Sequence, residues 1–143
     1  MIWDTLFSIA SGFAGLAWIW LIVLPRWNWA VFAVCYCLIG LFCLAYAALI
    51  LVFFFRVEGG GFNSIAQVRA LFSSDPVLVA GWLHYLAFDL VIGLWIVQRL
   101  EASAVSRLLQ APILAATFLF GPFGLLIAYV LLAASARLPP VDL

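Results

Sequence analysis

Apolar residues fill four long stretches of the chain, and polar residues gather in the short segments between them. A helix needs about 20 mostly apolar residues to cross a bilayer, and each of the four stretches reaches that length. Because lipid does not tolerate open sheet edges, apolar runs of this kind form helices. The pattern therefore predicts four membrane-spanning helices, at about residues 5–24, 28–55, 76–98 and 112–134.

The longest polar link, residues 56–75, carries the pattern of a short additional helix. Three glycines at 59–61 end the second apolar stretch, and Ser64 with Gln67 three residues later is typical of a capping box. Apolar residues then follow at helical spacing, at Ile65, Val68 and Leu71. This link predicts a short amphipathic helix that lies on the membrane surface.

Composition narrows the class of protein. Hydrophobic residues make up 69% of the 143 residues and charged residues only 8%, whereas a soluble domain carries about 25% charged residues. A soluble enzyme is therefore excluded. Six basic residues balance six acidic ones, so no basic patch is available to neutralise a nucleic-acid backbone. We expect one domain over residues 1–143, an all-α integral membrane bundle of four transmembrane helices with a short amphipathic helix between the second and third.

One charged residue, Asp89, falls near the middle of the third predicted helix. An ionisable residue at that depth costs about 2.5 to 3.5 kcal/mol on insertion scales, so it is a candidate functional group. His84, the only histidine, lies about 140° around the helix from Asp89 and could flank a cavity with it. Trp82 and Tyr85 share the helical face of Asp89. The alternatives are a structural, neutral carboxyl group and a histidine that only hydrogen-bonds to a carbonyl.

The fourth stretch is interrupted at its centre by Gly121 and Pro122. Proline removes one backbone donor and frees the carbonyl four residues earlier, and a freed carbonyl inside the membrane must be satisfied by protein or water. Broken helices at this depth are typical of binding sites. The alternative is a simple proline kink.

The segment Ala80–Leu90, which contains His84 and Asp89, resembles the signature of the abscisic-acid-deficient-4-like family related to plant neoxanthin synthase. Phe120-Gly121-Pro122 and the four-helix layout are also similar to that family. The resemblance implies an integral membrane protein that is linked in plants to the conversion of violaxanthin into neoxanthin. That conversion opens an epoxide and forms an allene without net redox change. We expect a multi-pass bacterial member of the family, located in the inner membrane.

The resemblance and the residue pattern together define a candidate site. Epoxide opening coupled to loss of a carbon-bound proton needs an acid and a base, and Asp89 and His84 are the expected catalytic pair. No metal or other cofactor is expected. The residues expected to contact the substrate are Gly81, Trp82, Tyr85, Phe88, Gly121 and Pro122.

The leading interpretation is a membrane protein that binds or isomerises a carotenoid-like apolar substrate by acid/base chemistry. As an enzyme it would be an intramolecular isomerase acting on a xanthophyll epoxide or a similar isoprenoid. One alternative is a non-catalytic membrane subunit that packs pigment, lipid or a partner protein. Another is a small proton-coupled carrier with Asp89 in its path. The expected partners are the lipid bilayer, a carotenoid or isoprenoid ligand, and a second copy of the chain or a larger membrane complex.

Overall fold

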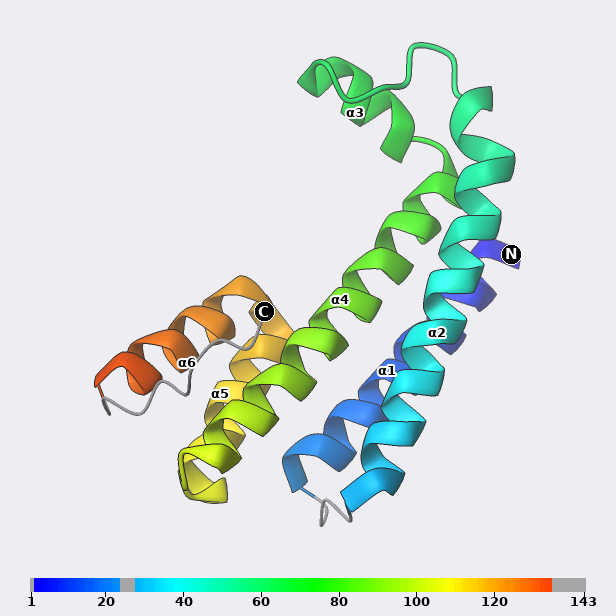
Figure 1. Ribbon diagram of the computed structural model, residues 1–143. Helices are drawn as coiled ribbons and strands as arrows, with labels where there is room; N and C mark the ends of the chain where they lie inside the picture. The colour runs from blue at the N-terminus through cyan, green and yellow to red at the C-terminus, as the bar shows by residue number, and fades with distance from the viewer. Residues whose placement is uncertain (1, 24–27, 135–143) are drawn as a thin grey trace. The chain divides into compact units, whose positions relative to one another are not determined.

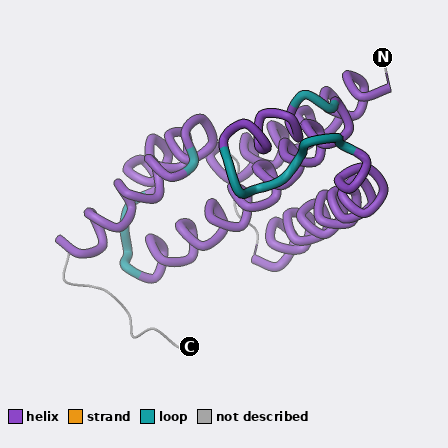
Figure 2. Tube along the Cα trace, turned by 90° about the horizontal axis from the view of Figure 1, so that it is seen from above, coloured by secondary structure: helices purple, strands orange, loops and turns teal. Residues whose placement is uncertain are grey.

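The computed structural model describes residues 2–23 and 28–134 (Figure 1). Every regular element in these ranges is helical, which confirms the all-α prediction (Figure 2). The elements are α1 (Ile2–Val23), α2 (Asn28–Phe53), the 3-10 turn η1 (Phe54–Arg56), α3 (Ile65–Phe72), α4 (Asp75–Ala102), α5 (Arg107–Phe120) and α6 (Pro122–Ala134). The predicted end of the first span at residue 24 lies outside the described residues.

Three helices in the described part of the chain are long and apolar enough to cross a membrane: α1, α2 with its 3-10 turn, and α4. These helices fit a membrane protein. Helices α5 and α6 have 14 and 13 residues, so at about 1.5 Å per residue each spans only about 20 Å. A hydrocarbon core is about 30 Å thick, and neither helix alone can cross it. The predicted count of four spans is therefore not confirmed.

The region of the fourth predicted span differs from the expectation in two ways. First, α5 begins at Arg107 rather than near Pro112, so the proline lies inside the helix. Second, the interruption at Gly121 separates two helices instead of kinking one. Gly124 on α6 packs directly against Thr117 on α5, which shows that the chain reverses at this point. The predicted break is correct, but the predicted continuous helix over 112–134 is wrong.

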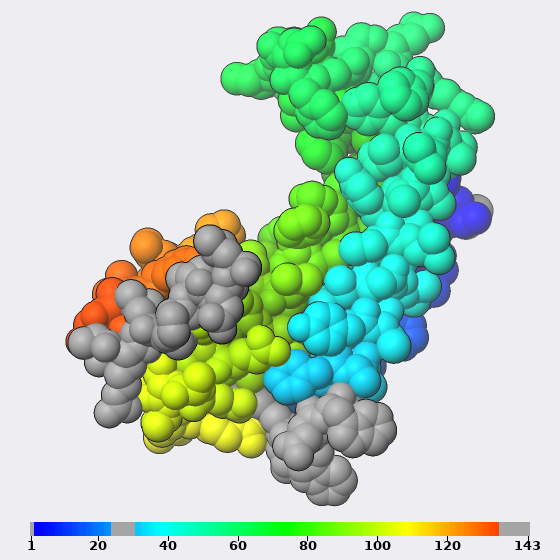
Figure 3. Space-filling model, in the orientation of Figure 1, coloured from blue at the N-terminus to red at the C-terminus, as the bar shows by residue number. Residues whose placement is uncertain are grey.

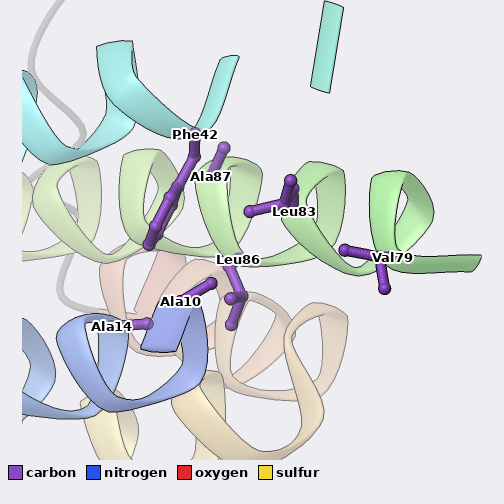
Figure 4. Close-up of a cluster of buried hydrophobic side chains, with 7 residues drawn as sticks. All are labelled: Ala10, Ala14, Phe42, Val79, Leu83, Leu86 and Ala87. Atoms are coloured by element: carbon purple, nitrogen blue, oxygen red, sulfur yellow. The ribbon is translucent and has the colours of Figure 1, made fainter. Parts of the chain in front are cut away.

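Contacts divide the chain into two compact units, and both units draw on α1, α2 and α4. The first comprises the chain up to Gly15 together with Cys35–Phe88, and the second comprises Leu16–Val34 and the chain from Asp89 onward. In the first unit, small and large apolar side chains from three helices form a buried cluster (Figure 4). Its members are Ala10 and Ala14 from α1, Phe42 from α2, and Val79, Leu83, Leu86 and Ala87 from α4.

The predicted amphipathic helix is α3, in the first unit, where it lies beside the first turns of α4 (Figure 3). The side-chain oxygen of Ser64 accepts a hydrogen bond from the backbone N–H of Gln67, as expected for a capping residue. The Gln67 side chain accepts a hydrogen bond from the N–H of Asn63, one residue before the expected partner. Of the three apolar residues predicted to share one face of α3, Leu71 is buried and Val68 is half-buried, whereas Ile65 is 78% exposed.

The turn after α4 is built around Ala104, which has a left-handed backbone (φ +54°). The N–H of Val105 donates to the carbonyl of Leu100 and the N–H of Ala104 donates to that of Glu101. This is a Schellman motif, in which glycine normally occupies the left-handed position. The buried Gln110 side chain donates to the carbonyl of Val105 and holds the turn in place.

Replacing Ala104 with glycine is expected to raise the free energy of unfolding by about 1 kcal/mol, because glycine adopts positive φ without a Cβ penalty. The measurement is reversible unfolding of the purified protein in detergent. Ala102→Gly, at the last residue of α4, is the matched control, and it should not raise stability because this residue keeps a helical backbone. The strain at Ala104 is contradicted if both variants lose stability equally.

Candidate functional site

Asp89 is buried at the middle of α4 and belongs to the second unit. Its side chain is only 6% exposed, although acidic residues are almost never buried to this degree unless they are paired. The atom Oδ2 accepts no hydrogen bond from the described part of the chain, whereas the residue as a whole does take part in other interactions. The carboxyl group is thus shielded from the surface and held in the interior of this unit.

Gly121 lies against the Asp89 carboxyl group, and both residues belong to the second unit. A Cβ atom on Gly121 would lie 2.8 Å from Oδ1 of Asp89. The backbone at Gly121 has φ +39° and ψ −93°, and its N–H donates to the carbonyl of Thr117. Position 121 requires glycine for two reasons, the positive φ and the close approach of the carboxyl group.

Two helix ends meet beside Asp89. Gly121 is the C-cap of α5 and immediately precedes α6, whose first residue is Pro122. The negative end of one helix dipole and the positive end of the other therefore lie close to the carboxyl group. The side chain of Pro122 itself is exposed. Of the two predicted contacts on this segment, Gly121 therefore adjoins Asp89, whereas Pro122 contributes the helix start.

Trp18, in the same unit, packs its indole ring against Gly93 and Phe118. A Cβ atom on Gly93, one helical turn beyond Asp89, would lie 2.5 Å from the Trp18 ring. The Trp18 ring also packs at 5.6 Å from the ring of Phe118 on α5. The absence of a side chain on Gly93 therefore leaves room for an indole ring. No sequence pattern pointed to Trp18, because a tryptophan in an apolar run looks like any other packing residue.

His84 belongs to the first unit, where it is exposed and lies between two aromatic rings. Its imidazole stacks on Phe88 with ring centres 4.5 Å apart. The ring of Tyr46 on α2 lies 5.5 Å away on a tilted plane. These contacts fix the position of the imidazole ring and leave it accessible. Tyr46 was not expected at the site, because nothing in the apolar second stretch distinguishes it.

Trp82 and Tyr85 also lie in the first unit, and their rings stack at 5.2 Å. The indole N–H of Trp82 donates to the hydroxyl of Ser11 on α1 at 2.9 Å. The ring of Phe7 packs against Trp82 at 4.9 Å. The indole donor of Trp82, which could have served a buried carboxyl group, is thus used to join α4 to α1.

A pocket of about 280 Å³ opens beside His84 in the first unit. A Cβ atom on Gly81 would lie 2.7 Å from the ring of Phe72, so the glycine lets that ring lie close to the backbone of α4. The lining is otherwise almost entirely apolar. It consists of Tyr46, Ile50, Phe54, Phe62, Leu71, Phe72, Val77, Gly81 and His84.

The predicted site residues thus fall into two groups. Gly81, Trp82, His84, Tyr85 and Phe88 belong to the first unit, and Asp89, Gly121 and Pro122 belong to the second. Within the described ranges, no three His, Cys, Asp or Glu side chains gather as ligands for a metal ion. Each unit therefore carries its own candidate chemistry, a carboxyl group in one and an imidazole beside an apolar pocket in the other.

Comparison with known families gives a match over most of the chain. The model of the family described as ABA DEFICIENT 4-like matches residues 5–128, a range that includes both His84 and Asp89. No curated protein and no solved structure gives a significant match.

Proposed function

The chain belongs to the ABA DEFICIENT 4-like family, and from this premise we propose that it binds or isomerises a carotenoid-like apolar substrate by acid/base chemistry within the membrane. Membership confirms the family expected from the segment Ala80–Leu90. The substrate and the reaction are the proposal, and the bacterial inner membrane is its proposed location.

The burial of Asp89 beside Gly121 is the observation that carries the proposal. Carboxyl groups that are shielded from water are common among catalytic acids and bases, because the site around them controls when they hold a proton. Removal of water strengthens every electrostatic interaction with a reacting group. An apolar substrate could therefore contact this carboxyl group without leaving the hydrocarbon of the membrane.

The proposed reaction moves one proton within the substrate and needs no oxidant or reductant. An acid protonates the epoxide oxygen as its carbon–oxygen bond breaks, and a base removes a carbon-bound proton as the new double bond forms. Asp89 is the proposed acid or base. His84 is the proposed second group, and it is tested separately because it belongs to the other unit.

Asp89→Asn is expected to lower conversion at least about 100-fold, the usual scale for loss of a general acid or base. The measurement is the xanthophyll profile of a pigment-producing host that expresses the protein. The asparagine keeps the size of the side chain but cannot transfer the proton. Asp75→Asn, at the exposed start of α4, is the matched control and should convert normally.

The outcome separates the proposal from its rivals. A pigment profile that is identical with and without the wild-type protein contradicts an isomerase. Copurification with a membrane complex would then favour a non-catalytic subunit, and pH-dependent flux in liposomes would favour a carrier.

A further inference from the structure

Helices α5 and α6 are apolar, but each is too short to cross a membrane. We propose that together they form a re-entrant hairpin, which enters the membrane and leaves it on the same side. The chain would then cross the membrane three times, by α1, α2 and α4, and the start of α1 and the end of α6 would lie on opposite sides. This path through the membrane is independent of the reaction proposed at Asp89.

The tip of the hairpin lies beside the middle of α4. Gly121 is the single residue between α5 and α6, and a Cβ atom on it would lie 2.8 Å from Oδ1 of Asp89. The 14 residues of α5 span about 20 Å, and the part of α4 from Asp89 to its end at Ala102 spans about the same length. Helix α5 therefore runs back along the second half of α4 and ends at the depth of Asp89.

Helix α6 returns toward the end of the membrane from which α5 came. Gly124 on α6 packs against Thr117 on α5, so the two helices are in contact immediately after the turn. Further along α6, the ring of Tyr129 packs at 5.3 Å from the ring of Trp95 on α4. Trp95 comes six residues after Asp89 and lies about 9 Å closer to the C-terminal end of α4. A helix that continued across the membrane from the tip would instead move away from that end.

The turn suits a location inside hydrocarbon, where backbone groups need partners within the protein. Gly121 is buried, its N–H donates to the carbonyl of Thr117, and its own carbonyl accepts from the N–H of Leu125. Pro122, the next residue, has no N–H to satisfy. No residue from Ala111 to Ala134 is charged. The reversal at mid-membrane therefore leaves neither polar backbone group of Gly121 without a partner.

The arginines give the orientation of this topology. On the side where α4 ends, the re-entrant hairpin gathers four of the six basic residues, namely Arg26, Arg99, Arg107 and Arg137. The other side keeps Arg56 and Arg69, whereas a fourth crossing would add Arg137 there and leave three on each side. Links that are richer in basic residues stay in the cytoplasm. The end of α6 is therefore assigned to the cytoplasm, and α3 to the outer surface of the membrane.

Cysteine labelling in a bacterial host tests the two sides. The native Cys35, Cys37 and Cys43 are replaced by alanine, and one cysteine is placed at the exposed Asn63 before α3, or after Leu143 through a flexible linker. A maleimide that cannot cross membranes should label Asn63→Cys in intact cells and the C-terminal cysteine only after permeabilisation. Labelling of both in intact cells, or of neither, overturns the hairpin. The reverse pattern overturns the orientation.

Ser106→Cys, in the exposed link between α4 and α5, is the matched control for the labelling. A hairpin keeps it on the same side as the C-terminal cysteine, whereas a fourth crossing would separate the two. If removal of the native cysteines prevents folding, the side is read from the wild-type chain with a reporter fused after Leu143. Green fluorescent protein should then fluoresce and alkaline phosphatase should be inactive. An active phosphatase without fluorescence overturns the assignment.

The depth of the tip is measured in lipid vesicles with nitroxide labels in the cysteine-free background. One label is attached to Phe123→Cys at the tip and the other to Leu108→Cys in the first turn of α5, since these side chains are 55% and 88% exposed. Oxygen concentrates at the bilayer centre, whereas a nickel chelate stays in water. The ratio of oxygen to nickel accessibility should therefore be several-fold higher at Phe123→Cys. Equal ratios overturn the re-entrant hairpin, because α5 and α6 would then lie together on the surface.

Discussion

Replacing Gly121 with alanine is expected to lower the free energy of unfolding by about 3 kcal/mol. The backbone at this residue has φ +39° and ψ −93°, a conformation outside the αL region that costs an L-residue about 1 to 3 kcal/mol. The new Cβ atom would also lie 2.8 Å from Oδ1 of Asp89, so the carboxyl group would have to move within a packed interior, which adds about 1 kcal/mol or more. Reversible unfolding in detergent measures the loss.

A double-mutant cycle separates the two causes. In an Asp89→Ala background the carboxyl oxygen is gone, and Gly121→Ala should then cost only the backbone strain of about 1 to 3 kcal/mol. The same cost in both backgrounds would contradict the close contact between Gly121 and Asp89. If the contact is present, Gly121→Ala should also reduce pigment conversion, because it displaces the proposed acid or base.

Replacing Gly124 with alanine is expected to lower the free energy of unfolding by about 3 kcal/mol, the upper end of the range for overpacking. A Cβ atom on Gly124 would overlap the backbone nitrogen, the Cα atom and the hydroxyl of Thr117. The hydroxyl of Thr117 is itself bonded to the carbonyl of Ile113 at 2.8 Å. Because the obstacle is a helix backbone, α5 and α6 must separate to admit a methyl group. The measurement is again reversible unfolding in detergent.

The control for Gly124 is a helical glycine whose added Cβ atom would meet no other group. Gly12 lies on α1, and a Cβ atom there would meet nothing within 4 Å. Gly12→Ala should therefore keep or raise stability, by up to about 1 kcal/mol, because alanine favours the helix more than glycine does. Equal effects of Gly12→Ala and Gly124→Ala would show that the close packing of α5 on α6 is absent.

Hydropathy predicted the long helices because a run of about 20 apolar residues can satisfy its backbone hydrogen bonds in lipid only as a helix or in a closed barrel. The capping residue Ser64 and the apolar spacing in α3 were equally readable, since both patterns are local. The break at Gly121 was also visible in the sequence. These features depend on residues that are near one another in the chain.

The features that the sequence did not reveal depend on how separate helices pack against one another. Whether a Gly-Pro pair kinks a helix or reverses it depends on what the following turn can pack against. Here the absence of a side chain on Gly124 lets α6 lie against Thr117. In the same way, the pocket beside His84 forms only where α2, α3 and α4 come together, with Tyr46, Leu71 and His84 in its lining. Helical periodicity carries no signal for such pairings.

The length of α4 has a consequence for the depth of Asp89. From Asp75 to Arg99 the helix spans 24 residue steps, about 36 Å at 1.5 Å per step, only slightly more than a hydrocarbon core of about 30 Å. In a bilayer, a vertical slide by one turn in either direction would draw one of these charges into the hydrocarbon, at about 2.5 to 3.5 kcal/mol. The charged residues near the two ends of α4 therefore limit how far the helix can shift along the membrane normal. If Asp75 and Arg99 lie at opposite headgroup layers, Asp89 lies near the middle of the hydrocarbon core between them.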